Sequence, residues 1–203
     1  MEKTGNSNKD PFELSFQFVS SMTSLVNALE AKDPYTAGHS IRVSNLAGKI
    51  AEQRNGVSPE VKEVQMAGKL HDIGKVGTPE RILHKPENLT KEEFDHIKKH
   101  PLLAEKILAP FEKLKSVSNV IKHHHERFDG KGYPDGLAGK DIPVLSRILT
   151  IVDSYDAMTS ARPYRPAMIP ENAMGEIRRG LGAQFDPEFG EIFIKLFLTG
   201  RIG

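Results

Sequence analysis

The residues of this sequence that could do chemistry are histidines and aspartates, and the clearest pair is His71 and Asp72. The two are adjacent, at the end of an apolar helical pattern that breaks at Gly74. A neutral imidazole can ligate one metal ion, and a carboxylate can bridge two ions through its two oxygens. On its own, the pair is better explained as a partly buried histidine beside a helix-terminal aspartate. It indicates a metal site only together with further ligands.

A run of three histidines, His123 to His125, supplies such ligands. If the apolar residues of 117–121 form the inward face of a helix, His124 falls on that face, His125 lies on its flank, and His123 points further away. A buried imidazole carries polar nitrogens that need partners, and a metal ion is one such partner. The alternative is a solvated basic helix face. The run therefore favours a metal site over a surface feature.

Four more candidates stay ambiguous by spacing alone. His39 lies one turn before Val43 and either binds a metal or forms a hydrogen bond in the core. His100 precedes a proline, so it could also simply end a helix. Asp153 and Asp156 lie in an apolar helical stretch, where a buried carboxylate needs a metal ion or a cationic side chain. Spacing does not choose between these two aspartates.

The composition restricts the kind of site that can form. The chain has 203 residues, 28 basic and 27 acidic side chains, a net charge of +1, 8 His and no Cys. Absence of cysteine excludes disulfide scaffolds, thiolate zinc sites and cysteine nucleophiles, so a metal site must use histidines and carboxylates. The balanced charge shows no excess of basic residues of the kind that binds a nucleic-acid polymer or a membrane surface. With no secretion signal and no long apolar run, we expect a cytoplasmic location.

Apolar residues recur at helical spacing along the chain, and no alternating pattern typical of a strand is present. We therefore expect an all-α fold: a flexible tail at residues 1–9, followed by a single compact helical domain at residues 10–203. Residues 127–143 are rich in glycine and proline and are expected to form a loop.

Capping signals and proline positions place the helices that should position these side chains. We expect helix starts near Asp10, Asp33, Ser58 and Thr90. The third helix should reach His71, and the helix from Thr90 should end near His100. Further helices are expected at residues 102–108, 117–124, 145–158, 170–180 and 187–198.

Taken together, the motifs resemble one known family. The segments that carry the resemblance are DPYTAGHSIRV (33–43), LHDIGKVGTPERIL (70–83), KKHPLLAEKIL (98–108), HHERFDGKGYPDGL (124–137) and SRILTIVDSYDAMTSARPYR (146–165). They are similar to the HD-GYP domains, a subgroup of the HD metal-dependent phosphohydrolases, over residues 10–200. The combination of HD-x-G-K, HHE-x-x-DG-x-GYP and D-x-x-DA is highly specific. The resemblance implies a helical bundle of the HD-domain type around the loop at 127–143.

The resemblance also implies two divalent metal ions, iron or manganese. The implied ligands of one ion are His39, His71, Asp72 and Asp153, and those of the other are Asp72, His100, His124 and His125. The family pattern uses the first aspartate of D-x-x-D, which selects Asp153 over Asp156. Family members that bind a third metal carry a carboxylate four residues before the first histidine ligand. This chain has Tyr35 there, so we expect two ions.

The activity implied by the resemblance is hydrolysis of cyclic di-GMP to the linear dinucleotide pGpG, and in some members to GMP. The nucleophile would be a hydroxide that bridges the two metals. The expected catalytic residues are Asp72 and Lys75, and Lys75 would bind the scissile phosphate. Arg162 and Arg165 would contact guanine or phosphate. Tyr133 of the Gly-Tyr-Pro loop would contact the substrate.

Other functions stay open at this point. The chain could hydrolyse another cyclic dinucleotide such as cyclic GMP-AMP, or carry out another HD-type reaction. It could also be a non-catalytic module whose Gly-Tyr-Pro loop docks diguanylate cyclase (GGDEF) domains, or that loop could be a structural turn only. All implied ligand positions are present, which favours an enzyme. Expected partners are a receiver or sensor domain and a second copy of the chain, packed through the N-terminal helix.

Overall fold

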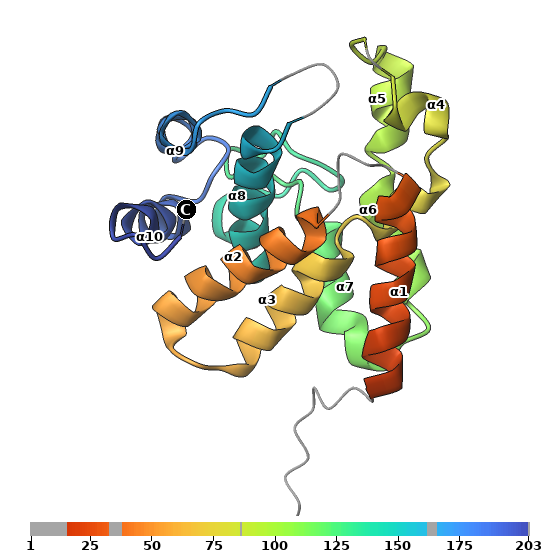
Figure 1. The fold of residues 1–203 in the computed structure, drawn as a ribbon, viewed down its shortest axis with the longest axis horizontal. Coiled ribbons are helices and arrows are strands. Elements are labelled where there is room, and N and C mark those ends of the chain that lie inside the picture. The colour runs from red at the N-terminus through yellow and green to blue at the C-terminus, as the bar shows by residue number, and fades with distance from the viewer. Residues whose placement is uncertain (1–15, 33–37, 86, 162–165, 203) are drawn as a thin grey trace, which may run out of the picture.

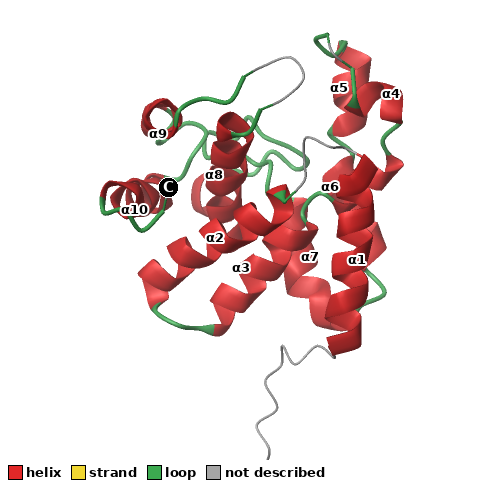
Figure 2. Ribbon diagram, viewed as in Figure 1, coloured by secondary structure: helices red, strands yellow, loops and turns green. Residues whose placement is uncertain are grey.

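The computed structural model describes residues 16–32, 38–85, 87–161 and 166–202. Within these residues the regular elements are helical, and strand-like pairing is limited to one isolated bridge between Leu181 and Phe185 (Figure 2). The prediction of an all-α fold is confirmed for this part of the chain. The tail at residues 1–9 and the helix start near Asp10 lie outside the described residues and stay predictions.

The described helices follow one another along the chain, and a long connection at residues 123–138 separates α7 from η3 (Figure 1). In order, they are α1 (Phe16–Lys32), α2 (His39–Asn55), α3 (Pro59–Leu70), η1 (Ile73–Gly77), α4 (Glu80–Leu83), α5 (Lys91–Ile97), α6 (His100–Leu108), η2 (Glu112–Leu114), α7 (Lys115–Lys122), η3 (Gly139–Asp141), α8 (Val144–Thr159), α9 (Pro170–Arg179) and α10 (Pro187–Leu198), where η marks a short 3-10 helix.

Helix α8 is the central element of the bundle. Ten of its residues are buried, and it packs against α2, α9, α10, α3 and α7. Helices α2 and α3 lie side by side, α9 and α10 cover one side of α8, and α4 and α5 project at the far end (Figure 1). The core is large, and each fully buried aliphatic or aromatic side chain contributes about 1.5–3 kcal/mol. Its largest fully buried members include Ile50, Leu70, Ile121, Ile148, Leu149, Phe189 and Phe193.

Two predicted helix starts are confirmed, and one of them has the predicted cap. Helix α5 begins after Thr90, whose hydroxyl accepts the backbone N–H of Glu93 at 3.3 Å while the Glu93 carboxylate accepts the N–H of Thr90 at 2.8 Å. This reciprocal pair is the capping box that the sequence predicted. Helix α3 begins at Pro59 directly after Ser58. A helix start benefits from proline because its missing N–H would have no partner there.

Three predicted boundaries are wrong. Helix α2 begins at His39 rather than near Asp33, and residues 33–37 lie outside the described part of the chain. Helix α5 ends at Ile97, and His100 opens α6 instead of ending a helix. The proline after His100 occupies the first turn of α6, where it is tolerated, rather than marking a stop. Helix α7 ends at Lys122, so the three histidines follow it in a turn.

Gly74 brings the 3-10 helix η1 against α6. A Cβ atom at this position would lie 1.9 Å from the backbone oxygen of His100 and 2.8 Å from the backbone nitrogen of Ala104. Any side chain here would therefore force the two segments apart. Because Asp72 directly precedes η1, this close approach sets how near its carboxylate lies to His100. Among the described residues, no helix combines the length and apolar composition needed to cross a membrane.

Candidate metal centre

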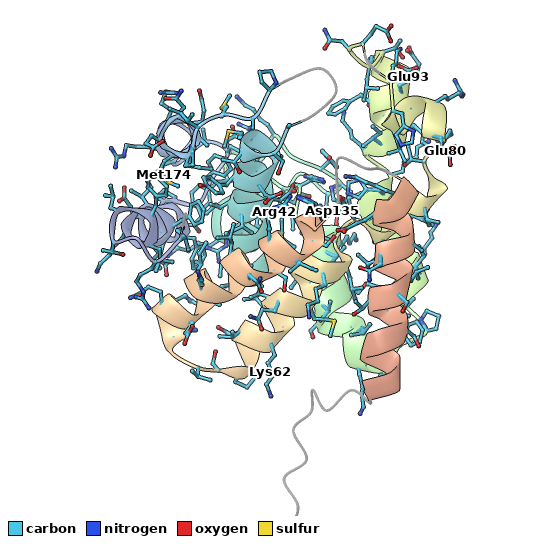
Figure 3. The ribbon with its side chains drawn as sticks, in the orientation of Figure 1. Arg42, Lys62, Glu80, Glu93, Asp135 and Met174 are labelled. Carbon is cyan, nitrogen blue, oxygen red and sulfur yellow. The ribbon has the colours of Figure 1, made fainter. Side chains whose placement is uncertain are left out.

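The seven side chains predicted to bind metal lie together, although five separate segments supply them. Six of the seven stand at or just beyond a helix end, and the seventh, Asp153, lies within α8. Figure 3 shows side chains crowding where α2 approaches α8, with Arg42 and Asp135 labelled there. The other six are His39 at the start of α2, His71 and Asp72 after α3, His100 at the start of α6, and His124 and His125 after α7.

One group of potential ligands consists of His39, His71 and Asp153, which we call the His39 group. The Nε2 atom of His39 lies 3.2 Å from Nε2 of His71 and 3.3 Å from Oδ1 of Asp153. Nε2 of His71 lies 3.7 Å from the same Asp153 oxygen. Two imidazole nitrogens and a carboxylate oxygen this close together form an N/O donor set that suits a divalent metal ion.

A second group consists of His100, His124 and His125, which we call the His100 group. One ring nitrogen from each lies within 4.8 Å of the others. Among the described residues, Nε2 of His100 and Nε2 of His124 are buried without a hydrogen-bond partner. Their Nδ1 atoms lie 2.8 Å from the Ile97 carbonyl oxygen and 2.5 Å from the Ile121 carbonyl oxygen.

The tautomer in the His100 group follows from those contacts. A carbonyl oxygen can only accept, so Nδ1 carries the proton in His100 and His124. The Nε2 lone pairs then face the cluster unsatisfied, which is costly inside a protein unless something binds them. A metal ion is the partner that fits a cluster of neutral imidazoles. The residues present therefore fit a metal centre.

Asp72 faces both groups with different oxygens. Its Oδ2 atom lies 3.5 Å from Nε2 of His71 and 3.9 Å from Nε2 of His39, and its Oδ1 atom lies 3.6 Å from Nε2 of His100. This arrangement suits a carboxylate that bridges two ions. Lys75, expected to contact phosphate, donates a hydrogen bond of 2.6 Å from its ammonium to Oδ2 of Asp72.

The charges of the two groups differ. Burial alone would lower the pKa of His39, but its hydrogen bonds to Asp153 and Asp156, with the charges of Asp153 and Asp72, outweigh burial and raise that pKa to about 9. Burial lowers the pKa of His100 to about 3, and the neighbouring His125 adds to the effect. Burial likewise lowers the pKa of His125 to about 4. At neutral pH the metal-free His39 ring is therefore charged, and these rings of the His100 group are neutral.

The carboxylates are ionised despite their burial. Burial alone would raise the pKa of Asp72, but the charge of the Lys75 ammonium holds it well below its usual value. Burial acts in the same direction on Asp153, whose pKa hydrogen bonds from His39 and His71 keep well below its usual value. Both side chains can therefore act as anionic ligands over the physiological pH range.

The Gly-Tyr-Pro loop lies against the His100 group. The Tyr133 ring lies 4.9 Å from the His125 ring, centroid to centroid, and the Tyr133 N–H donates to the His125 carbonyl oxygen at 3.2 Å. A Cβ atom at Gly132 would lie 2.4 Å from the backbone nitrogen of Arg127, so only glycine allows this approach. Tyr133 thus covers one side of His125.

Glu126 and His123 hold this loop, and the sequence did not single out either role. The Glu126 carboxylate accepts the backbone N–H groups of Asp135 at 2.7 Å and Gly136 at 3.0 Å. His123 was expected to point away from the interior, but it is buried and its Nε2 lies 3.0 Å from the Asp135 carboxylate. The correction has a simple cause. The helix ends before His123, so its helical position does not predict its direction.

Asp156, the aspartate that spacing could not separate from Asp153, lies behind the His39 group. Its carboxylate contacts the Nδ1 atom of His39, on the opposite side of the ring from the cluster. Arg42 on α2, which the sequence did not single out, pairs with the same carboxylate. Arg42 lies one helical turn after His39, and this spacing could have indicated that the two side chains share a partner. Arg162, Arg165 and Tyr35 lie outside the described residues, so the expectations for them stay predictions.

The sequence is similar to known proteins over most of its length. The family model described as HD domain matches residues 23–189. A cyclic di-GMP phosphodiesterase of Thermotoga maritima is 40% identical over 97% of this chain and 53% of its own length. A 3'3'-cGAMP-specific phosphodiesterase of Vibrio cholerae is 37% identical over 82% of this chain and 36% of its own length. The chain thus spans about half, or less, of the length of these relatives.

The fold also matches a solved structure. A cyclic GMP-AMP-specific phosphodiesterase of Vibrio cholerae superposes with a TM-score of 0.69 at 21% sequence identity. The match covers 89% of this chain and 49% of the solved one. At this identity the likeness establishes a shared helical fold.

Proposed function

The chain belongs to the HD-domain family, and from this premise we propose that it is a metal-dependent phosphodiesterase that hydrolyses cyclic di-GMP to linear pGpG. The observation that carries the proposal is the pair of ligand groups joined by Asp72, whose two oxygens face one group each. The relative from Thermotoga maritima named for this activity, 40% identical, supports the choice of substrate. We place this activity in the cytoplasm.

We propose that the centre holds two ions, iron or manganese, with the ligands predicted from the sequence. Bound there, the ions would polarise a phosphoryl oxygen and lower the pKa of a bound water. His100 and His124 contribute neutral imidazoles whose unpartnered nitrogens already face the cluster. Asp72 contributes one oxygen to each half of the centre.

The remaining residues act on the substrate in this proposal. The Lys75 ammonium lies 2.6 Å from Asp72 at the edge of the centre, where it can pair with the scissile phosphate and offset its charge. Tyr133 shields His125 and offers the substrate an aromatic surface. Arg162 and Arg165 are proposed to bind guanine or phosphate from the segment that follows α8. Hydrolysis adds one water across a single phosphodiester bond, so the ring opens and no other reactant is needed.

A direct assay tests this proposal. The purified protein is stripped of metal, reloaded with Fe²⁺ or Mn²⁺ under reducing conditions, and incubated with cyclic di-GMP, and the products are separated by chromatography. We expect pGpG in the reloaded sample and none in the stripped sample. Absence of turnover with either metal at full metal content would overturn the proposed activity.

A second candidate substrate is cyclic GMP-AMP, favoured by the 37% identity to a Vibrio cholerae enzyme named for that specificity. The two substrates share the phosphodiester and differ in one base, so the metal centre does not distinguish them. Measuring kcat/KM for both substrates with the same reloaded protein decides between them. A ratio in favour of cyclic GMP-AMP would replace the first candidate.

We also propose the expected partners. The relatives are about twice as long as this chain or longer, which supports a receiver or sensor domain beside it in the intact protein. Helix α1 exposes Leu25, with 43% of its surface accessible, and could pack against a second copy. Docking of a GGDEF domain on the Gly-Tyr-Pro loop would use its exposed residues at 135–136. Sedimentation of the chain alone, and with a GGDEF domain added, tests both contacts.

A further inference from the structure

We infer that Asp156, which is not among the proposed metal ligands, is a positioning residue that orients His39 and sets which of its nitrogens meets the metal. Its Oδ2 atom lies 2.7 Å from Nδ1 of His39, and Asp156 is only 3% exposed. An ionised carboxylate can only accept, so Nδ1 keeps its proton, and Nε2 is the nitrogen that faces His71 and Asp153. The inference rests on the proposed metal centre and adds a residue to it.

The other histidines of the centre explain why His39 needs this partner. His71, His100 and His124 each place Nδ1 on the backbone carbonyl three residues earlier, at distances of 2.9, 2.8 and 2.5 Å. His39 directly follows Gly38, whose φ of 72° interrupts the right-handed turn that such a contact requires. The ring is therefore fixed by a side chain from α8 instead of by its own backbone.

Asp156 is itself held firmly. Arg42 donates from Nε to Oδ1 at 2.6 Å and from Nη2 to Oδ2 at 2.9 Å, the two-pronged geometry that suits a carboxylate. The Ser160 hydroxyl donates to Oδ2 at 3.2 Å, and Arg42 also donates to that hydroxyl at 3.1 Å. These contacts join the first turns of α2 to the end of α8, so the position of His39 depends on how the two helices pack.

A carboxylate behind a metal-binding imidazole does more than fix the tautomer. It makes the ring a better electron donor, and loss of such a partner lowers metal affinity by about 10- to 100-fold. Because Asp156 contacts His39 and lies away from the His100 group, its effect should fall on one of the two ions. A residue that acts only on folding would weaken both ions alike.

The test measures metal affinity without substrate. Wild type, Asp156→Asn, Arg42→Lys and the control Asp141→Asn are titrated with Mn²⁺ against a chelator, and bound metal is counted. Asp141 is an exposed residue of η3. We expect two ions in wild type and the control, and an affinity about 10- to 100-fold lower for one ion only in Asp156→Asn. Arg42→Lys keeps the charge, loses the two-pronged contact, and should weaken the same ion by less.

Nitrogen-15 NMR of the imidazole rings in metal-free protein adds a readout independent of affinity. We expect a protonated, hydrogen-bonded His39 Nδ1 in wild type and a changed Nδ1 signal in Asp156→Asn, with the His100 and His124 signals unchanged. Unaltered affinities in Asp156→Asn, or equal weakening of both ions with unchanged circular dichroism, would overturn this inference alone. A wild-type chain that binds no metal would overturn the proposed function together with it.

Discussion

His39 and His100 each open a helix and each lie in the same centre, but their surroundings are opposite. Carboxylates surround His39, which lies 3.3 Å from Asp153 and 2.7 Å from Asp156, and its pKa rises to about 9. Burial lowers the pKa of His100 to about 3, and a backbone carbonyl fixes its ring. The His39 group therefore holds a proton where a metal would bind, and the His100 group leaves its buried Nε2 atoms without partners.

The difference shows two ways of preparing a metal site. In the His39 group, acidic side chains fix the geometry before a cation arrives, and a proton occupies the place of the missing positive charge. In the His100 group, backbone carbonyl oxygens fix the rings of His100 and His124. Their buried Nε2 atoms destabilise the folded state until a metal ion binds them. Asp72 lies between the His39 group and the His100 group, so its replacement has the largest predicted effect.

Replacing Asp72 with alanine removes the link between the two halves. We expect fewer than two bound ions and a loss of turnover well beyond the about 10- to 100-fold that follows from removing a residue behind a ligand. Metal content and cyclic di-GMP hydrolysis, both measured on the same sample, check this. Asp141→Ala is the matched control and should behave as wild type. Normal metal content in Asp72→Ala would contradict the bridging role.

Metal removal tests the His100 group through stability. Stripping leaves the Nε2 atoms of His100 and His124 buried without partners, whereas His39 keeps its carboxylates. Metal at 100 times its Kd stabilises the folded state by about 2.7 kcal/mol per site, which for a chain of this size raises Tm by about 5–10 °C. Calorimetry of stripped and reloaded protein measures the shift. An unchanged Tm at full occupancy would show that the nitrogens are satisfied in another way.

The pH dependence of metal affinity separates the two halves. The raised pKa of His39 means that metal must displace a proton at any pH below about 9. Affinity at the His39 group should therefore rise about tenfold per pH unit between pH 6 and pH 8. The lowered pKa values of His100 and His125 predict no such slope for the other ion.

Calorimetric titrations in buffers of different ionisation enthalpy count the protons released by each ion. At pH 7 we expect metal binding to release one proton from the His39 group and none from the His100 group. Equal release from both ions would remove the distinction between the halves. In Asp156→Asn the release from the His39 group should decrease, because the pKa of His39 falls towards its ordinary value.

The smallest expected effect comes from Glu30 on α1. Its carboxylate accepts the N–H of Gly38 at 2.9 Å and of Ser40 at 3.0 Å, and thereby caps the helix that His39 opens. Glu30→Gln keeps one acceptor oxygen and should lower the free energy of unfolding by about 0.5–1.5 kcal/mol, measured by urea denaturation. Glu52→Gln, an exposed change on α2, is the control. Equal effects of the two changes would argue against this cap.

Local signals predicted the fold well where neighbouring residues settle the outcome. The capping box at Thr90 and the proline after Ser58 acted as predicted, because both depend on residues a few positions apart. His100 was misplaced because a proline after a histidine can follow a helix or open one, and the choice depends on the elements packed around it. The turn after Lys122 was missed for a related reason, since nothing in the local pattern required α7 to stop there.

By itself, the amino-acid sequence determined the all-α class, the exclusion of thiolate ligands, and the histidines and aspartates from which a metal centre could be built. The tertiary structure alone decided how they are used. Asp153 and Asp156 share one helix face, but His39, from a distant segment, meets them with opposite sides of its ring. The pKa values diverge for the same reason. Charge and burial at each ring come from helices that lie far apart in the chain and meet only after folding.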